Sequence, residues 1–159
     1  MKQLLIDEQK ARSRYKSASP EIKEILEDTF GKEFFSGEIT DRIKTYEDAC
    51  MEIGEQHIDE NKLINPLLSI DEILLRKIKT ITKALNEGWK PDWNDSSQRK
   101  WFPWFRMSSG GFVFGGADFG LSCAGAGYAS RLCFKNKELA EYAGKQFTKL
   151  YSDYILYYQ

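Results

Sequence analysis

Histidine and cysteine, from which most metal sites and nucleophilic centres are built, are scarce in this sequence. Its 159 residues include one histidine, His57, and three cysteines, Cys50, Cys123 and Cys133. The cysteines are odd in number and show no metal-ligand spacing, which argues against a zinc site. We therefore expect no bound metal and no other cofactor, and three free thiols in a reducing compartment.

Long apolar runs are also missing. The first residues, MKQLLIDEQKARSRYK, contain only a three-residue apolar run before Asp7, and no later run approaches the length that crosses a membrane. The sequence predicts neither a signal peptide nor a membrane anchor. We expect a soluble, cytoplasmic protein with no membrane partner.

An excess of positive charge is missing too. The net charge is −1, which argues against a protein that holds duplex DNA by bulk electrostatics. The charges are unevenly placed, because residues 1–97 carry 15 Lys and Arg against 20 Asp and Glu, whereas residues 98–159 carry 8 against 4. A mildly basic C-terminal part therefore follows an acidic N-terminal part.

What the sequence does have is a stretch rich in glycine and aromatic residues, over 99–135. Seven of the twelve glycines lie between Gly110 and Gly127, and the four tryptophans lie between Trp89 and Trp104. Glycine at this density is unfavourable in a helix, whereas the clusters WFPWF, GFVF and RLCF are typical of short strands. We predict at least three antiparallel strands, near 99–106, 111–116 and 128–135. Pro103 should lie at an edge or a bulge, because proline lacks a backbone donor.

Helical periodicity dominates the rest of the chain. Apolar stripes and capping residues predict helices over 19–30, 40–53 and 69–87, and a last helix that begins at Asn136 and continues to about residue 155. With 42% hydrophobic residues the chain can form one domain, 1–159, in which residues 1–18 are a loose arm or a short helix. The fold class is α+β: a helical N-terminal half, a small antiparallel sheet, and a C-terminal helix packed on that sheet. The helix should contact the sheet through Leu139, Ala143 and Phe147.

The aromatic strand is the strongest candidate for a binding surface. Residues 101–102 and 104–105 are adjacent aromatic pairs, so whichever face the strand buries, a large ring of each pair points the other way. Either helices and loops cover both faces, or one face is an exposed aromatic platform. Its flanking cations would be Arg99, Lys100 and Arg106, with Arg131 on a neighbouring strand. Such a platform suits a nucleotide or a single strand, because rings stack on bases and guanidinium groups bind phosphates. The candidate ligand-binding residues are Trp101, Trp104, Arg106, Ser108, Ser109, Asp118 and Arg131.

The glycine motifs SSGGFVFGGADFG and AGAG match phosphate-binding loops only loosely. Neither contains GxxxxGK[ST], nor a GxGxxG between a strand and a helix. The glycines can serve tight hairpins and bulges, or a mobile flap in which Ser108 and Ser109 donate to an anion. Asp118, the single charged residue between Met107 and Ser130, is either a buried, perturbed carboxylate or a turn former.

Catalytic arrangements are poor. His57 lies in a polar linker and Cys133 in an apolar strand, where an inert thiol is expected. Paired acids occur on helices, in surroundings typical of solvated faces. An enzyme is therefore the least favoured class, and we assign no catalytic residue.

Three phrases, ALNEGWKPDW, WFPWF and SRLCFKNKELAEYAGKQF, resemble a family of small uncharacterised proteins encoded by phages and prophages of gut Bacteroides-type bacteria. The resemblance covers residues 20–155. It implies a viral or mobile-element context, and hence the cytoplasm of a host cell. It implies no known activity and no catalytic residues.

Two functions follow from these observations. One is a non-catalytic protein that binds a nucleotide-like anionic ligand through the aromatic, glycine-rich and basic face; in a phage setting it would sequester a host defence signal. The other is a protein–protein interaction or assembly component that uses the same aromatic surface. The tyrosines near the C-terminus fit either burial within the monomer or a contact in a homo-oligomer.

Overall fold

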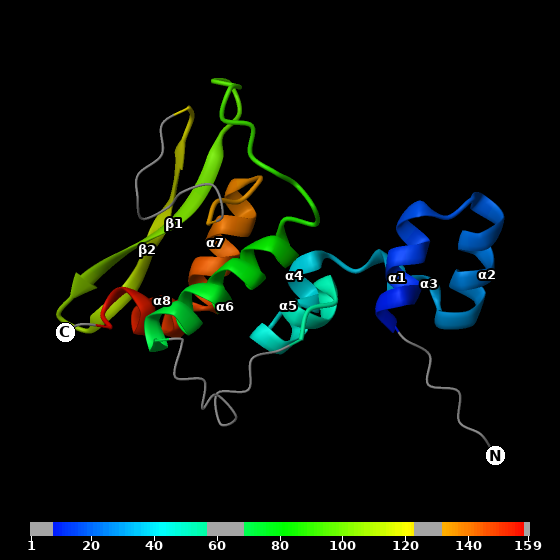
Figure 1. Ribbon diagram of the computed structural model, residues 1–159, viewed down its shortest axis with the longest axis horizontal. Coiled ribbons are helices and arrows are strands. Elements are labelled where there is room, and N and C mark those ends of the chain that lie inside the picture. The colour runs from blue at the N-terminus through cyan, green and yellow to red at the C-terminus, as the bar shows by residue number, and fades with distance from the viewer. Residues whose placement is uncertain (1–7, 57–68, 123–131, 158–159) are drawn as a thin grey trace, which may run out of the picture.

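The protein has two separate hydrophobic clusters. In the computed structural model, residues 8–56, 69–122 and 132–157 are described. A small aromatic cluster lies among the first three helices, and a main core is shared by the later helices and a β-hairpin (Figure 1). The fold class is α+β, as predicted.

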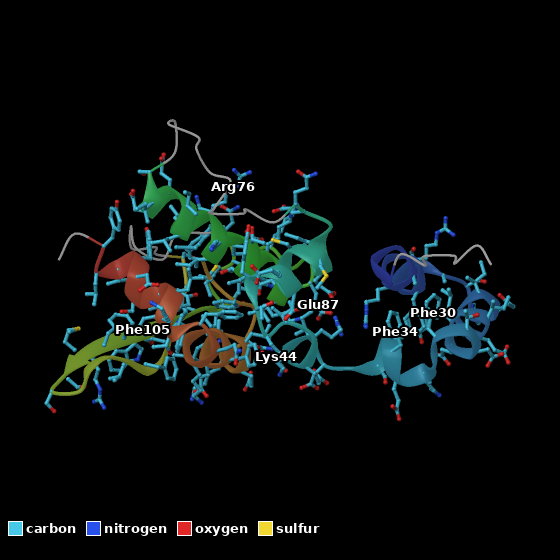
Figure 2. The ribbon with its side chains drawn as sticks, turned by 90° about the horizontal axis from the view of Figure 1, so that it is seen from below. Phe30, Phe34, Lys44, Arg76, Glu87 and Phe105 are labelled. Atoms are coloured by element: carbon cyan, nitrogen blue, oxygen red, sulfur yellow. The ribbon has the colours of Figure 1, made fainter. Side chains whose placement is uncertain are left out.

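The first three helices enclose a small group of rings. They are α1 (Glu8–Ser17), α2 (Pro20–Phe30) and α3 (Lys32–Ser36). The predicted start of α2 is confirmed, with Ser19 at the N-cap and Pro20 as the first helical residue. The enclosed rings, whose centroids lie 4.2–5.8 Å apart, belong to Tyr15, Phe30, Phe34 and Phe35 (Figure 2). The predicted apolar stripe of α2 is only partly used, since Ile22 and Ile25 are 50% and 63% exposed.

The single helix predicted over 40–53 is wrong, because the chain forms two helices there. They are α4 (Ile39–Arg42) and α5 (Tyr46–Ile53). Thr45 starts the second one: its side chain accepts from the Asp48 backbone N–H at 3.1 Å, and the Asp48 carboxylate accepts from the Thr45 N–H at 2.9 Å. The apolar residues nevertheless face the core as predicted, with Ile43, Tyr46, Ala49 and Cys50 buried.

Helix α6 (Ile70–Leu85) forms the centre of the main core. It begins as predicted, with the Glu72 carboxylate accepting from the Ser69 N–H at 2.8 Å. Just after its end, the buried Asn86 side chain donates to the Cys133 carbonyl at 2.8 Å and accepts from the Lys135 N–H at 3.0 Å. This amide joins α6 to the segment that leads into the next helix.

The sheet is an antiparallel hairpin of β1 (Lys100–Ser108) and β2 (Gly111–Gly120). Its register shifts between Trp104 and Phe105, because Gly115 of β2 has no partner residue on β1. Pro103 therefore lies next to a bulge, in a sheet of two strands, as the edge-or-bulge prediction requires. The predicted third strand, 128–135, falls partly outside the described residues. In its described part only Phe134 pairs, through one antiparallel bridge with Trp101.

Two helices cover one side of the hairpin, α7 (Lys137–Gln146) and α8 (Thr148–Ile155) (Figure 1). The Asn136 side chain caps α7 as predicted, accepting from the Leu139 N–H at 2.9 Å, and Leu139, Ala143 and Phe147 are buried. The predicted continuous helix is broken at Phe147. There the Thr148 hydroxyl donates to the Gly144 carbonyl at 2.6 Å, a side-chain bond of the kind that bends helices.

Gly144 brings α7 close to the hairpin. A Cβ atom at this position would overlap the ring of Phe114 and lie 2.9 Å from the Cβ of Pro103. No side chain fits between the helix and the two strands at this point.

Replacing Gly144 with alanine should therefore lower the free energy of unfolding by about 1–3 kcal/mol. The direction is diagnostic, because this substitution within an ordinary helix stabilises by about 1 kcal/mol. Urea unfolding measures the change. The control is Gly37→Ala, whose Cβ would have no neighbour nearer than 3.9 Å. An unchanged or raised midpoint for Gly144→Ala would contradict the close packing.

Candidate functional site

The two faces of the hairpin have different surroundings. Pro103 and Phe114 contact Gly144 of α7, and the Phe105 ring lies 4.9 Å from that of Tyr151 in α8, so these side chains occupy the helix-covered face. Because side chains alternate along a strand, Trp104 and Arg106 lie on the opposite face. We call this the outer face; its residues are Trp104, Arg106, Gly115, Gly116 and Asp118.

Trp104 lies flat on the backbone of β2. A Cβ at Gly115 would be 2.5 Å from the nearest carbon of the Trp104 ring, and one at Gly116 would be 2.9 Å from its nitrogen. The two glycines therefore make room for the indole, an arrangement known to support glycines in sheets. They belong to strand β2, which replaces both the phosphate-loop and the mobile-flap interpretation for this part of the motif.

The Trp104 ring is held on one side and accessible on the other. The residue is 42% exposed, and no described helix lies on this face (Figure 1). A ring fixed by a backbone floor loses little freedom when a ligand stacks on it. Of the predicted aromatic platform, Trp104 is the exposed ring, whereas Lys100, predicted beside it, is buried and donates to the Asp95 carbonyl at 2.9 Å.

A cation and a carboxylate lie on opposite sides of this ring. Arg106 follows two residues after Trp104, about 6.6 Å along the strand, and is exposed. Asp118 pairs with Phe102, two residues before Trp104. Asp118 is also exposed, and its carboxylate accepts from the Phe119 N–H at 2.8 Å. It is thus neither a buried carboxylate nor a turn residue, because it lies within β2.

The other predicted ligand-binding residues do not join Trp104. Trp101 is on the helix-covered face, half-buried, with its ring centroid 4.9 Å from that of Phe119. The Ser108 hydroxyl closes the hairpin turn, donating to the Gly111 carbonyl at 3.1 Å and accepting from the Gly110 N–H at 3.2 Å. Ser109 is exposed at the tip of that turn. Arg131 lies outside the described residues.

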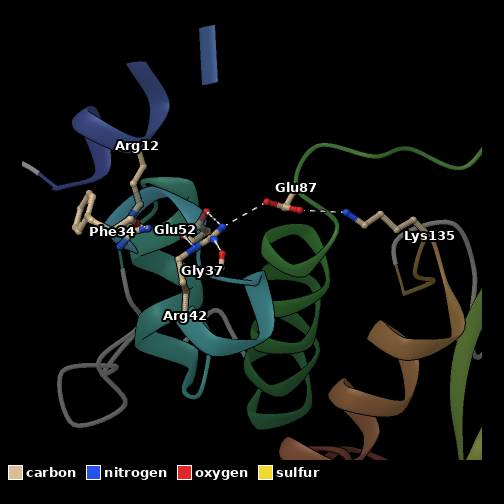
Figure 3. Close-up of polar contacts among 7 residues, drawn as sticks. All are labelled: Arg12, Phe34, Gly37, Arg42, Glu52, Glu87 and Lys135. Atoms are coloured by element: carbon tan, nitrogen blue, oxygen red, sulfur yellow. Dashed lines mark hydrogen bonds and ion pairs between the residues drawn. The ribbon is translucent and has the colours of Figure 1, made fainter. Parts of the chain in front are cut away.

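A chain of charged groups, not foreseen from the sequence, joins α4 and α5 to the segments after α6 and before α7 (Figure 3). Its centre is Arg42, which donates to the Gly37 carbonyl and binds the Glu52 carboxylate at 3.1 and 3.3 Å. Arg42 also reaches Glu87 at 3.3 Å, and the other carboxylate oxygen of Glu87 binds Lys135 at 3.1 Å. Opposite charges compensate one another along this chain, so we assign it a structural role.

Two cysteines are buried and free, as predicted for Cys50 and Cys133. Burial raises the pKa of the Cys50 thiol, and it raises the pKa of Cys133 from 9.0 to about 11. Cys123 and His57 lie outside the described residues. Among residues 8–56, 69–122 and 132–157 there is no group of three or more His, Cys, Asp or Glu that could hold a metal ion.

The chain was compared with protein-family models, curated proteins and solved structures. No family model, curated protein or solved structure matches the chain significantly. Within the described segments, no helix has both the length and the apolar character needed to cross a membrane. The function must therefore be argued from the residues themselves.

The thiols give a direct test of burial. In a Cys123→Ser variant, Cys50 and Cys133 should react slowly with a thiol reagent at pH 8, because the thiolate is the reactive form and both groups are shielded. Adding denaturant should make both react at once. Absorbance after addition of Ellman's reagent measures this, and a fast native reaction of either thiol would contradict its burial.

The contact between the Trp104 indole and the backbone at Gly115 can be tested by a double-mutant cycle. Gly115→Ala should destabilise the protein by about 1–3 kcal/mol, because the new methyl group collides with the indole. In a Trp104→Ala background the same change should cost little, since the colliding ring is gone. Urea unfolding of the four proteins gives the coupling energy. An equal cost in both backgrounds would mean that Trp104 does not rest on Gly115.

Proposed function

We propose that this is a non-catalytic binding protein whose ligand stacks on Trp104 at the outer face of the hairpin. The ligand class is a nucleotide-like anion, with a planar base and a phosphate. The observation that carries the proposal is the Trp104 ring, supported on one side by Gly115 and Gly116 and exposed on the other. Stacking of a base on such a ring contributes about 1–3 kcal/mol.

The charged groups of Arg106 and Asp118 would orient the ligand on the Trp104 ring. A phosphate would lie toward Arg106, whose guanidinium can bind it with charge-assisted hydrogen bonds. The Asp118 carboxylate, at the other side of the ring, only accepts hydrogen bonds and would meet amino or ring N–H groups of the base. The proposal thus separates affinity for the phosphate from selection of the base.

The resemblance to phage and prophage proteins supplies a context for such binding. Under this proposal the chain acts in the cytoplasm of a bacterial host and sequesters a nucleotide signal of host defence. Sequestration needs tight binding and no chemical step.

A protein partner is the second candidate, and exposed apolar side chains near the hairpin favour it. Met107, Phe119 and Leu121 are all exposed, so the hairpin and the residue after it carry apolar surface besides Trp104 that a protein could cover. The partner could be another protein or a second copy of this chain.

Calorimetric titration with nucleosides, nucleoside mono- and diphosphates and cyclic nucleotides tests the first candidate. Trp104→Ala should weaken binding of every base by about 1–3 kcal/mol. Arg106→Ala should weaken it by about 1.5–3 kcal/mol, and should do so only for ligands that carry a phosphate. Asp118→Asn should change the order of preference among bases more than the overall affinity.

Arg14→Ala is the matched control, because Arg14 is an exposed arginine on α1, far along the chain from the hairpin. Circular dichroism of each variant verifies the fold. Equal weakening by Arg14→Ala and Arg106→Ala would contradict the proposed contact. Absence of binding to any nucleotide, together with a dimer or a cross-linked partner lost in Trp104→Ala, would replace the ligand by a protein.

A further inference from the structure

The chain reverses sharply after α6. Glu87 (φ 48°) and Gly88 (φ 86°) both adopt left-handed backbone conformations, and the Trp89 N–H donates to the Asn86 carbonyl at 2.9 Å. Such a conformation is uncommon for a residue with a side chain. Here the ion pairs from Glu87 to Arg42 and Lys135 hold it in place (Figure 3).

An open concavity of about 230 Å³ lies between this reversal and the last turns of α6. Helix α6, residues 89–91 and Cys133 all contribute to its lining. The lining residues are Lys79, Thr82, Lys83, Asn86, Trp89, Lys90, Pro91 and Cys133.

Three lysines line the concavity, and none of its lining residues is acidic. Lys79 and Lys83 are one helical turn apart on α6, so their side chains lie on the same face. Lys90 joins them from the segment after the turn. Lys83 also binds Glu55 at 2.7 Å, whereas neither Lys79 nor Lys90 forms an ion pair with another described residue.

Apolar groups also line the concavity. They are the half-buried indole of Trp89 and the ring of Pro91, beside the buried Cys133. The Asn86 side chain is already hydrogen-bonded to backbone groups of residues 133 and 135. The charged donors that remain for an anion are therefore the lysine ammonium groups. This combination of lysines and apolar side chains around one concavity suits a small phosphate ester with a planar group.

A neighbouring concavity does not share this character. It measures about 140 Å³ and lies against the charged chain of Figure 3. Its two arginines, Arg12 and Arg42, already bind backbone carbonyls, and its carboxylates Glu52 and Glu87 would repel an anion.

We propose that the concavity beside α6 is a second, separate binding site for a small phosphorylated ligand. The phosphate is held by Lys79 and Lys90, since the Lys83 ammonium already pairs with Glu55, and the planar part of the ligand lies against Trp89. None of the lining residues belongs to the outer face of the hairpin, so this site does not depend on the proposed function.

Two probes separate the charge from the apolar groups: inorganic pyrophosphate, which cannot stack, and phenyl phosphate, which can. Calorimetric titration at fixed ionic strength should detect both. Lys79→Ala and Lys90→Ala should each weaken both probes at least about tenfold. Trp89→Leu should weaken phenyl phosphate and leave pyrophosphate nearly unchanged.

Lys149→Ala is the matched control, because this lysine of α8 is 88% exposed and pairs only with Asp153 one turn away among the described residues. The Trp104→Ala/Arg106→Ala double variant should bind pyrophosphate like the parent, which distinguishes this site from the hairpin platform. Circular dichroism verifies that all variants fold. The proposal is overturned if neither probe binds at millimolar concentration, or if Lys149→Ala weakens them as much as Lys79→Ala and Lys90→Ala do.

Discussion

The buried side-chain amide of Asn86 connects the helical layer of the main core to the sheet. It bonds to the carbonyl of Cys133 and the N–H of Lys135, the backbone groups on either side of Phe134. Phe134 has no exposed surface, and its own backbone pairs with Trp101 of β1. A hydrogen-bonded path from α6 to the hairpin thus runs through this amide, beside the apolar packing of the core. Its loss would leave two backbone groups without their partner in a dry environment, a larger cost than the net gain from a typical hydrogen bond.

The same end of α6 also shapes the surface. Glu87 follows Asn86 directly and turns the chain while its carboxylate bridges Arg42 and Lys135. The short segment after α6 therefore has two roles: Asn86 bonds to the segment 133–135, and residues 86–91 help to form the lysine-lined concavity. The aromatic platform depends on a different constraint, the close approach of α7 at Gly144, which makes the opposite face of the hairpin the accessible one.

The sequence predicts those elements whose apolar stripe and capping residue lie within a few consecutive positions. Helices α2 and α6 and the start of α7 carry an apolar stripe and a capping residue within a few positions of each other, and all three are present. The apolar stripe continues through the break before Tyr46 and so does not predict it, although Thr45 and Asp48 carry the capping signal. The site is less predictable. Alternation separates Trp101 from Trp104, but only a contact with α7, some forty residues later, decides which of them is covered. Lys79 and Lys83 show their spacing in the sequence, whereas Lys90 approaches them only because a glutamate adopts a left-handed conformation that no sequence pattern indicates.

The aromatic cluster of α1–α3 differs from the main core in how its contacts are spaced along the chain. All its rings lie between Tyr15 and Phe35, so it forms from local contacts, which close quickly. The main core joins Ile39 to Tyr151 and requires almost the whole chain. During synthesis the first three helices can assemble while the C-terminal part is still being made. The protein would then leave the ribosome with one cluster complete, and α4–α8 and the hairpin would fold beside it.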